Sequence, residues 1–393
     1  MVILIGLQCI SLLKKIVILI KVKKIKIYLL RYKLSNPVIT SFGQMNSRPS
    51  LLIELIDENN NSGFGEIWCN FPQYGSEYRF KIFVNYFSKL ILENDISDPE
   101  NFYEKISHKL KILSIQSGDT GAFNNILSGI DCAIWDLFAK SKKTPLNKLF
   151  SQNSPNKIKV YASGINKNEY FDKINFARKF GINRFKIKIG FNYQEDIKII
   201  NLLENFIQKN ENYMLDVNQG WPNEIAIKNL EKYKDYKSFW IEEPISADND
   251  YETIKKLINM FSNLAFGENI NSKEFFFKIS NSTKIKFLQP DITKFGGISF
   301  IQQILKKIDG TRLWLHYLGG AIGLISSCHI MTHINPSGYM EMDINDNPLR
   351  TDILEPKIKV KDGYIELNQS PGIGFSINYN NLSRYIIETY ETD

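Results

Sequence analysis

The chain has 393 residues, which exceeds one ordinary domain and suits a barrel with one further domain. Its apolar content of 43% can fill a large core, and its charged content of 23% is near the average for soluble proteins. The net charge of +7 is spread along the chain without a basic block that alternates with aromatic residues, so we do not expect a nucleic-acid partner. Such lysines are usually solvated, although they can also steer anionic substrates.

The four cysteines lie far apart, at Cys9, Cys69, Cys132 and Cys328. They form neither a C-x-x-C pair nor a zinc-binding spacing, so we expect free thiols in a reducing compartment and a cytoplasmic protein.

Residues 1–21 are expected to form an extra N-terminal segment outside the fold. Lys14 and Lys15 interrupt the apolar residues, and neither apolar half is long enough to span a bilayer. A secretory signal would carry its positive charge before the apolar run, whereas here the charge follows it. The alternative is a membrane-associated helix, and we do not expect stable membrane insertion.

Residues 22–150 predict an α+β domain. Three apolar, mostly β-type runs form an antiparallel meander, with a polar loop over 40–48 that contains Arg48. The predicted strands are 25–30, 50–56 and 64–68. Helical periodicity follows over residues 78–93 and 126–139, and a short segment at 145–150 leads to a polar boundary.

Residues 157–355 contain a repeated unit. Short apolar runs end in ionisable residues at steps of 23 to 28 residues, with helical patterns between them. The run ends are Lys188, Asp216, Glu242, Glu268, Asp291, His316 and Glu341, and a further strand is available at 159–162. A strand, a loop and a returning helix need this length, so the pattern predicts a (β/α)8-type barrel whose strand ends open on one face. Residues 356–393 should pack on the first domain, since the eight units already account for the barrel.

Three acids at consecutive run ends, Asp216, Glu242 and Glu268, form the strongest candidate site. Carboxylate oxygens suit a hard cation such as Mg²⁺, which also accepts substrate oxygens. The alternative for each acid is a salt bridge with a barrel lysine.

Lys186 and Lys188 are two residues apart on one predicted strand and therefore face the same side. A neighbouring cation and partial burial both lower the pKa of an ammonium group, so one lysine could act as a base near pH 7. The alternative is that both lysines pair with the acids opposite.

His316 follows Asp291 by one unit, and a carboxylate on one ring nitrogen fixes the tautomer and raises the basicity of the other nitrogen. Glu341 could donate a hydrogen bond to a substrate oxygen if it stays protonated, and the alternative is a surface acid. His329 and His333 have the i, i+4 spacing of a metal pair but lie in an apolar helix, so we interpret them as core residues. The glycines of 319–323 should let backbone approach a ligand and start the next helix.

Together these residues resemble the enolase superfamily, and specifically the mandelate racemase subgroup of its mandelate racemase/muconate lactonizing enzyme family. The resemblance covers nearly all of residues 22–385. It depends on Lys186-x-Lys188, Asp216-x-Asn218, Glu242-Glu-Pro, Gly-Glu268-Asn, Gln-Pro-Asp291, His316 with its glycine run, and Glu341-Met-Asp with Asn-Pro-Leu-Arg350. One departure is Trp314-Leu-His316, which lacks the proline often found before this histidine.

The resemblance implies a capping domain whose loops close the site, and Mg²⁺ bound by Asp216, Glu242 and Glu268. It implies that Lys188 is the base on one face, with Lys186 lowering its pKa, and that His316 with Asp291 forms the dyad on the other face. Glu341 would hydrogen-bond the substrate carboxylate. We assign Asn218, Arg48 and Trp68 as substrate-binding residues, because the 40–48 loop and the region from Trp68 would set specificity.

The shared step in this family is removal of a proton α to a carboxylate. A β-hydroxyl in the substrate would lead to loss of water and a 2-keto acid, as in an acid-sugar dehydratase. Without one, the same site would catalyse racemisation, epimerisation or cycloisomerisation, and a non-catalytic binding protein is a third possibility. We expect a small carboxylate as the partner and a homo-oligomer as the assembly.

Overall fold

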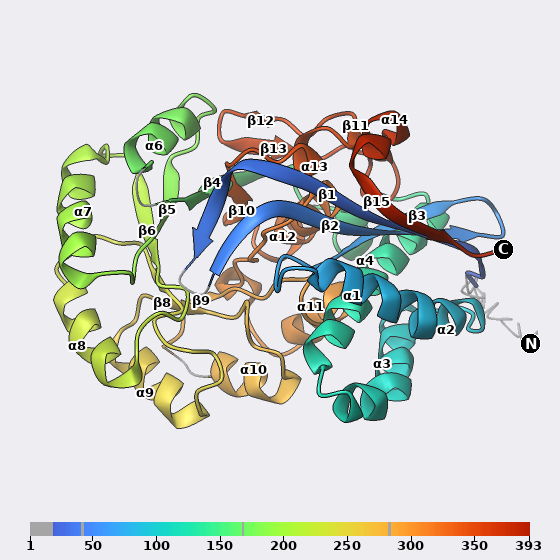
Figure 1. Cartoon of the computed structure of the whole chain (residues 1–393), viewed down its shortest axis with the longest axis horizontal. Coiled ribbons are helices and arrows are strands. Elements are labelled where there is room, and N and C mark those ends of the chain that lie inside the picture. The colour runs from blue at the N-terminus through green and yellow to red at the C-terminus, as the bar shows by residue number, and fades with distance from the viewer. Residues whose placement is uncertain (1–18, 41–42, 167–168, 282–283) are drawn as a thin grey trace, which may run out of the picture.

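The computed structural model describes residues 19–40, 43–166, 169–281 and 284–393 (Figure 1). It contains a cap, built mainly from the N-terminal residues, and a barrel of parallel strands with helices on its outside. The fold class predicted from the sequence, an α/β barrel with an α+β capping domain, is therefore confirmed. The expected extra segment over residues 1–21 lies almost entirely outside the described residues.

The cap is a four-stranded antiparallel sheet with helices packed against it. The strands are β1 (Val22–Thr40), β2 (Gly43–Asp57), β3 (Ser62–Ile67) and β15 (Ile386–Glu391), in the order β15-β1-β2-β3. The helices are α1 (Gly75–Ile82), a π-helical turn (Phe83–Phe87), α2 (Ser88–Leu92), α3 (Pro99–Gln116), α4 (Thr120–Ser141) and α5 (Leu146–Phe150). Helix α4 lies so close to β3 that a Cβ on Gly65 would overlap the carbonyl oxygen of Gly129, so this strand position requires glycine.

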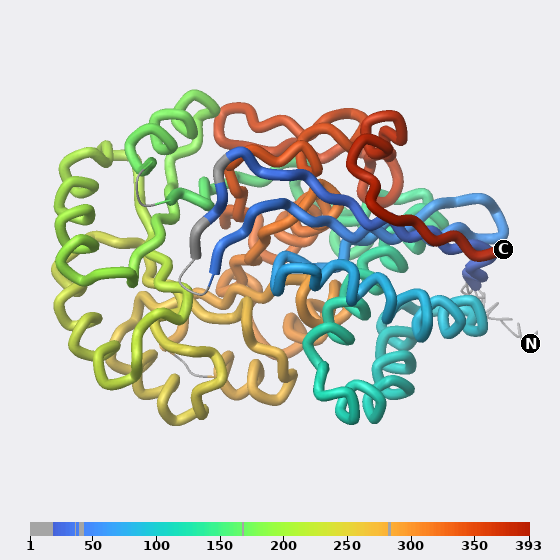
Figure 2. The backbone as a smooth tube through the Cα atoms, in the orientation of Figure 1, coloured from blue at the N-terminus to red at the C-terminus, as the bar shows by residue number. Residues whose placement is uncertain are grey.

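Two features of the cap differ from the prediction. Residues 43–48, expected in a loop, belong to β2, because β1 and β2 pair as far as Thr40 and Gly43; residues 41–42 of that loop lie outside the described residues. The paired hairpin runs from the cap over the barrel (Figure 2). Helix α3 is absent from the predicted elements, although Asp98 caps it by accepting from the Asn101 N–H and Pro99 starts it.

The barrel strands are parallel neighbours in sequence order, and β10 closes the sheet by pairing with β4. The strands are β4 (Lys157–Ile165), β5 (Arg184–Lys188), β6 (Asn212–Asp216), β7 (Ile241–Glu242), β8 (Leu264–Phe266), β9 (Phe287–Leu288) and β10 (Tyr339–Asp343). The outer helices are α6 (Tyr170–Arg178), α7 (Tyr193–Phe206), α8 (Asn223–Tyr233), α9 (Tyr251–Met260), α10 (Lys273–Ser280), α11 (Gly297–Leu305) and α12 (Ala321–Ile334), with a 3-10 turn at Gly310–Arg312. Each of the helices lies between two strand regions, where the sequence predicts a helical pattern.

The segment expected to be a strand at residues 313–316 pairs poorly with its neighbours in the barrel. It forms only an isolated bridge between Leu313 and Leu288, and its backbone hydrogen bonds run from the Trp314 N–H to the Leu288 carbonyl (2.8 Å) and from the His316 N–H to the Pro290 carbonyl (3.2 Å). Within the part of the chain that the structure describes, β10 pairs with β4 and not with this segment. The barrel is therefore continuous around seven strands, with His316 in the gap between β9 and β10.

The C-terminal residues are divided between the two regions. Strands β12 (Val360–Lys361) and β13 (Tyr364–Glu366) form a hairpin, and β13 pairs antiparallel with β4 of the barrel. Only β15 joins the cap sheet, where it pairs with β1. The remaining elements are α13 (Pro348–Thr351), β11 (Leu354–Glu355), β14 (Ser376–Ile377), α14 (Tyr379–Leu382) and a 3-10 turn (Ser383–Tyr385).

The inside of the barrel is filled by a separate aromatic cluster. It contains Tyr161, Met214, Trp240, Ala265, Phe287, Trp314 and Tyr339. This packing fills the barrel below the strand ends, and a pocket lies at their C-terminal side. Among the described helices, none combines the length and the apolar character needed to cross a bilayer.

Candidate active site

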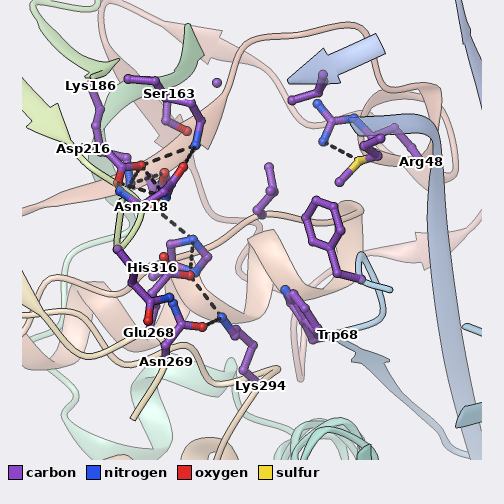
Figure 3. A pocket seen from close by; sticks show the side chains of 18 residues that line it. Arg48, Trp68, Ser163, Lys186, Asp216, Asn218, Glu268, Asn269, Lys294 and His316 are labelled. Atoms are coloured by element: carbon purple, nitrogen blue, oxygen red, sulfur yellow. Dashed lines mark hydrogen bonds and ion pairs between the residues drawn. The ribbon is translucent and has the colours of Figure 1, made fainter. Parts of the chain in front are cut away.

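A pocket of about 250 Å³ lies where the strand ends meet the cap. Its barrel side, which we call the barrel floor, is formed mostly by polar and charged side chains from the strand ends and the loops after them: Ser163, Gly164, Lys186, Lys188, Asp216, Asn218, Gln219, Glu268, Asn269, Lys294, His316, Leu318 and Glu341. Its cap side, the cap wall, consists of Val38, Met45, Arg48, Trp68 and Phe71. Figure 3 shows Arg48 and Trp68 facing the labelled floor residues across the cavity.

The two lysines of β5 both contact acids. Lys186 Nζ lies 2.6 Å from Glu242 Oε1 and 2.8 Å from Glu341 Oε1. Lys188 Nζ lies 3.5 Å from Asp216 Oδ2 and donates a hydrogen bond to Asn218 Oδ1. These contacts agree with the alternative prediction, in which both lysines pair with the acids opposite. Burial would lower the pKa of Lys186, but Glu242 and Glu341 hold it well above its ordinary value. Lys186 is therefore a charged ammonium group whose charge is balanced by these two carboxylates.

His316 joins two carboxylates. Its Nδ1 lies 2.9 Å from Asp291 Oδ2, and its Nε2 lies 3.1 Å from Glu268 Oε2. Burial lowers the pKa of His316, yet the charges of Glu268, Glu341 and Asp291 outweigh it and raise the pKa to about 9. The ring is therefore an imidazolium at neutral pH, with Nε2 directed to Glu268. The dyad expected from the sequence is present as a contact.

Glu341 is a buried acid and not a surface one, with 3% of its surface exposed. Burial raises its pKa, but Lys186 and His316 lower it below the ordinary value. Lys186 and His316 therefore favour the carboxylate form of Glu341 over the protonated form. As a carboxylate, Glu341 accepts a hydrogen bond from Tyr161 Oη at 3.0 Å.

The three candidate metal ligands lie on consecutive units. Asp216 and Glu242 end β6 and β7, and Glu268 follows β8 by two residues. They are 2%, 1% and 8% exposed. Within the described ranges, no three His, Cys, Asp or Glu side chains come together closely enough to hold a metal ion. Each acid instead contacts another partner: Asp216 accepts from Asn218 Nδ2, Glu242 from Lys186, and Glu268 from Lys294 Nζ at 3.1 Å.

The donor chemistry nevertheless fits a divalent cation. Burial raises the pKa of Glu242 to about 7, and the charges of Asp216, Glu341 and Glu268 add to this effect against the opposing Lys186. Negative charge is thus crowded at these strand ends, and a Mg²⁺ ion would relieve it with ligands of the type it prefers. In this structure, the three carboxylates that would bind the ion contact lysine and histidine side chains.

The three candidate substrate-binding residues all line the pocket. Asn218 bridges Asp216 and Lys188. Arg48 reaches from β2 to the barrel, where its Nη2 lies 2.6 Å from Asp343 Oδ2, and its buried Nε has no hydrogen-bond partner among the described residues. Trp68 places its ring 4.8 Å from Lys294 Nζ.

Sequence reasoning missed two charged residues of the site. Lys294 is buried, lines the pocket, and donates to Glu268 and to Asn269 Oδ1 at 2.7 Å. Its position three residues after Asp291, in the loop after a predicted strand, was an available signal. Glu243 lies behind the pocket lining, buried beside Asn269 in a left-handed backbone conformation (φ 40°), and within the described part of the chain its Oε1 has no hydrogen-bond partner. No local pattern distinguishes this acid from its neighbour Glu242.

Two family models match the chain. "Enolase C-terminal domain-like" covers residues 172–381, and "Mandelate racemase / muconate lactonizing enzyme, N-terminal domain" covers residues 24–151. A D-galactarolactone cycloisomerase of Agrobacterium fabrum is 24% identical, over 93% of this chain and 98% of the relative. An arabinonate dehydratase of Saccharolobus solfataricus is 25% identical, over 82% of this chain and 87% of the relative.

Solved structures agree in fold. A mandelate racemase/muconate lactonizing enzyme from Bordetella bronchiseptica is 28% identical with a TM-score of 0.85, covering 93% of this chain and 99% of the other. A racemase from Streptomyces coelicolor, crystallised with bound magnesium, is 20% identical with a TM-score of 0.81, covering 94% of this chain and 100% of the other.

Proposed function

Because the chain belongs to the mandelate racemase/muconate lactonizing enzyme family of the enolase superfamily, we propose that it is a Mg²⁺-dependent hydro-lyase. Its substrate is a small hydroxy-carboxylate of the acid-sugar type, and its product is a 2-keto acid. The observation that carries the proposal is one pocket in which Lys188 and His316 contact different acids, Asp216 and Glu268. A candidate base and a candidate acid are therefore available to one substrate.

Asp216, Glu242 and Glu268 would hold the Mg²⁺ ion. When bound, the cation supplies Lewis-acid stabilisation of the negative charge that develops on the substrate carboxylate. The crowded, buried acids and the magnesium found in the Streptomyces coelicolor racemase support this assignment.

The chain's own residues would move the protons. Lys188, as a neutral amine, takes the α-proton, and the electron pair of the broken C–H bond moves toward the carboxylate. His316, as an imidazolium, gives its Nε2 proton to the β-hydroxyl, the C–O bond breaks and water leaves. The resulting enol loses its hydroxyl proton while its β-carbon takes up a proton, and it becomes the 2-keto acid. Asp291 holds His316 Nδ1 and so directs Nε2 toward the substrate.

Other floor and wall residues would bind the substrate. Lys186 and Glu341, which already pair with each other, would orient its carboxylate end. Asn218, Arg48 and Trp68 would contact the remainder.

A second function uses the same residues. If the substrate has no leaving β-hydroxyl, proton return to the α-carbon gives racemisation or epimerisation, and internal attack gives cycloisomerisation. The Agrobacterium fabrum cycloisomerase matches almost its full length to this chain and supports this alternative.

The proposal includes the organisation of the molecule. We propose an extra segment at 1–21, a cap at 22–150, a catalytic barrel at 157–355 and a tail at 356–393. Pairing of β15 with β1 supports the assignment of the tail to the cap, whereas pairing of β13 with β4 assigns part of it to the barrel. We also propose a homo-oligomeric, cytoplasmic enzyme.

The test is a panel of sugar acids and aldaric acids incubated with the enzyme and Mg²⁺ in deuterated water. Formation of a 2-keto acid supports dehydration. Deuterium at the α-carbon without keto acid or loss of substrate selects racemisation or epimerisation, and an isomeric lactone selects cycloisomerisation. A protein that neither binds Mg²⁺ in calorimetry nor exchanges any α-proton would contradict both functions.

A further inference from the structure

The segment that carries His316 is weakly held by the barrel itself. It contacts β9 through one bridge and two backbone hydrogen bonds, and it has no ladder to β10 among the described strands. A side chain that must deliver a proton within hydrogen-bond distance needs a fixed backbone. Residues 317–323, which connect His316 to α12, must therefore be held by another part of the molecule.

A carboxylate from the cap holds this segment. Glu66, at the end of β3, accepts from the Gly320 N–H at 2.7 Å and from the Gly323 N–H at 2.9 Å. Its Oε2 lies 3.1 Å from Tyr317 Oη, and its Oε1 accepts from Ser50 Oγ at 2.8 Å. Glu66 thus binds the residue directly after His316 and the free amide groups at the start of α12.

The fit of this contact leaves little freedom. Glu66 is 4% exposed and has no cationic partner among these contacts. Its charge is balanced by amide groups at the N-terminus of a 14-residue helix, where the helix dipole favours an anion. A Cβ on Gly320 would lie 2.7 Å from Glu66 Oε1, so the carboxylate fills the space that the glycine leaves. The backbone of this glycine run is thus approached by a side chain of the cap.

The segment after β3 contacts the two loops that carry the dyad residues. Asn70 Nδ2 donates to the Leu318 carbonyl at 2.5 Å, on the His316 side. The Trp68 N–H donates to the Thr293 carbonyl at 3.3 Å, and Thr293 in turn binds Asp291 through its own N–H at 2.7 Å. In these contacts the cap reaches the loops of His316 and Asp291.

We propose that Glu66 is a positioning residue of the cap, which fixes the 317–323 segment and so holds His316 at the substrate. The inference rests on the proposed function, because it assigns Glu66 to the imidazole side of the reaction only. Lys188 is on β5, which pairs with β6 along all five of its residues and with β4 on its other side, and none of these pairs involves Glu66.

Glu66→Gln is the informative variant. It keeps the shape but places an amide N–H₂ group against the N–H of Gly320 or Gly323, where only an acceptor fits. Glu54→Gln is the matched control, because Glu54 is also a buried cap carboxylate (3% exposed) but contacts Tyr28, Ser62 and Tyr379 instead of the barrel loop.

The experiment compares α-proton exchange and product formation for the same substrate. We expect Glu66→Gln to lower product formation about 10- to 100-fold while exchange by Lys188 stays within about 2-fold, which is the pattern of His316→Asn in a milder form. Glu66→Asp, which retains the charge, should recover part of the loss, and Glu54→Gln should leave both rates unchanged. Equal loss of both rates in Glu66→Gln, or no loss, overturns the inference.

A measurement without substrate separates this inference from the proposed function. Hydrogen–deuterium exchange of the peptide over residues 313–323 should be faster in Glu66→Gln and unchanged in Glu54→Gln. If the peptide exchanges equally in all three proteins, the positioning role is refuted, whatever the reaction is. If the peptide responds but the wild-type protein exchanges no α-proton, the proposed function fails alone. Should Glu66→Gln not fold, the comparison uses Glu66→Asp.

Discussion

The barrel floor and the cap wall face the same cavity with opposite chemistry. Ten of the thirteen floor residues can carry charge or an amide, and several of them neutralise one another through short contacts such as Lys186–Glu341. Four of the five wall residues are apolar, and the only charge is on Arg48. Buried charges need partners, so the floor forms a fixed network, whereas the wall offers surface to carbon atoms and one cation to a polar group. The floor is therefore suited to a reaction, and the wall to the choice of substrate.

The largest effect should come from the floor. Lys188→Ala and His316→Asn should each lower turnover about a thousand-fold or more, because each removes a proton-transfer group. Steady-state rates with the substrate found in the panel provide the measurement. Met45→Leu is the matched wall control and should keep its rate within a few-fold. Full activity of either floor variant would contradict the role assigned to that residue.

Removal of a proposed metal ligand comes next. Asp216→Asn should lower Mg²⁺ affinity by more than the roughly 100-fold that loss of an outer-shell partner costs, since it removes an anionic ligand. Calorimetric titration with Mg²⁺ measures this, and chelation of the metal should lower the melting temperature of the wild-type protein only. Glu274→Gln, on the exposed side of α10, should bind Mg²⁺ as the wild type does. Unchanged affinity in Asp216→Asn would count against the three-acid site.

The single charge of the wall has a smaller expected effect. Arg48→Met should raise KM about 10- to 100-fold with little change in kcat, because a hydrogen bond to a charged group contributes about 1.5–3 kcal/mol. Arg350→Met is a matched control, since Arg350 Nη1 also contacts Asp343 (3.2 Å) but does not line this pocket. If both variants raise KM equally, Arg48 acts through Asp343 and not on the substrate.

The smallest effect separates stability from catalysis. His329 is fully buried in α12, far from charge, and burial lowers its pKa to about 4, whereas His316 on the floor has a pKa of about 9. A buried neutral histidine stabilises the fold above pH 6.5, and this contribution is lost as pH falls toward 4. Unfolding in urea should lose about 1 kcal/mol of stability from this residue between pH 7.5 and 5.5. This loss should be absent in His329→Asn and retained in His108→Asn, which changes an exposed residue.

The period of the sequence predicted the barrel because each unit is local: a strand, a loop and a helix within 23 to 28 residues. It therefore placed Asp216, Glu242, Lys188 and His316 at one end of the sheet, and all lie there. His329 was interpreted as a core residue because it lies in an apolar helix, which is also a local pattern. The structure confirms this interpretation, since His329 Nε2 lies 3.1 Å from the Ile373 carbonyl oxygen.

Contacts between residues that are far apart in the chain could not be predicted from the sequence. The pairing of Lys186 with Glu242 and Glu341 depends on which acids face one lysine across the barrel, which no spacing specifies. The hydrogen bond from the Gly320 N–H to Glu66 joins residues that are 254 positions apart. Residues 43–48 have a polar composition typical of a loop, but pairing with β1 makes them a strand.

The pairing of β15 with β1 has a consequence for the order in which the enzyme matures. Strand β1 is made first on the ribosome and its neighbour on one side comes from residues 386–391, so that edge stays open while the whole barrel is being translated. An open strand edge invites pairing with other chains. Lys24 and Lys26, which later contact Glu391, place positive charge along that edge and would repel a second copy in the meantime.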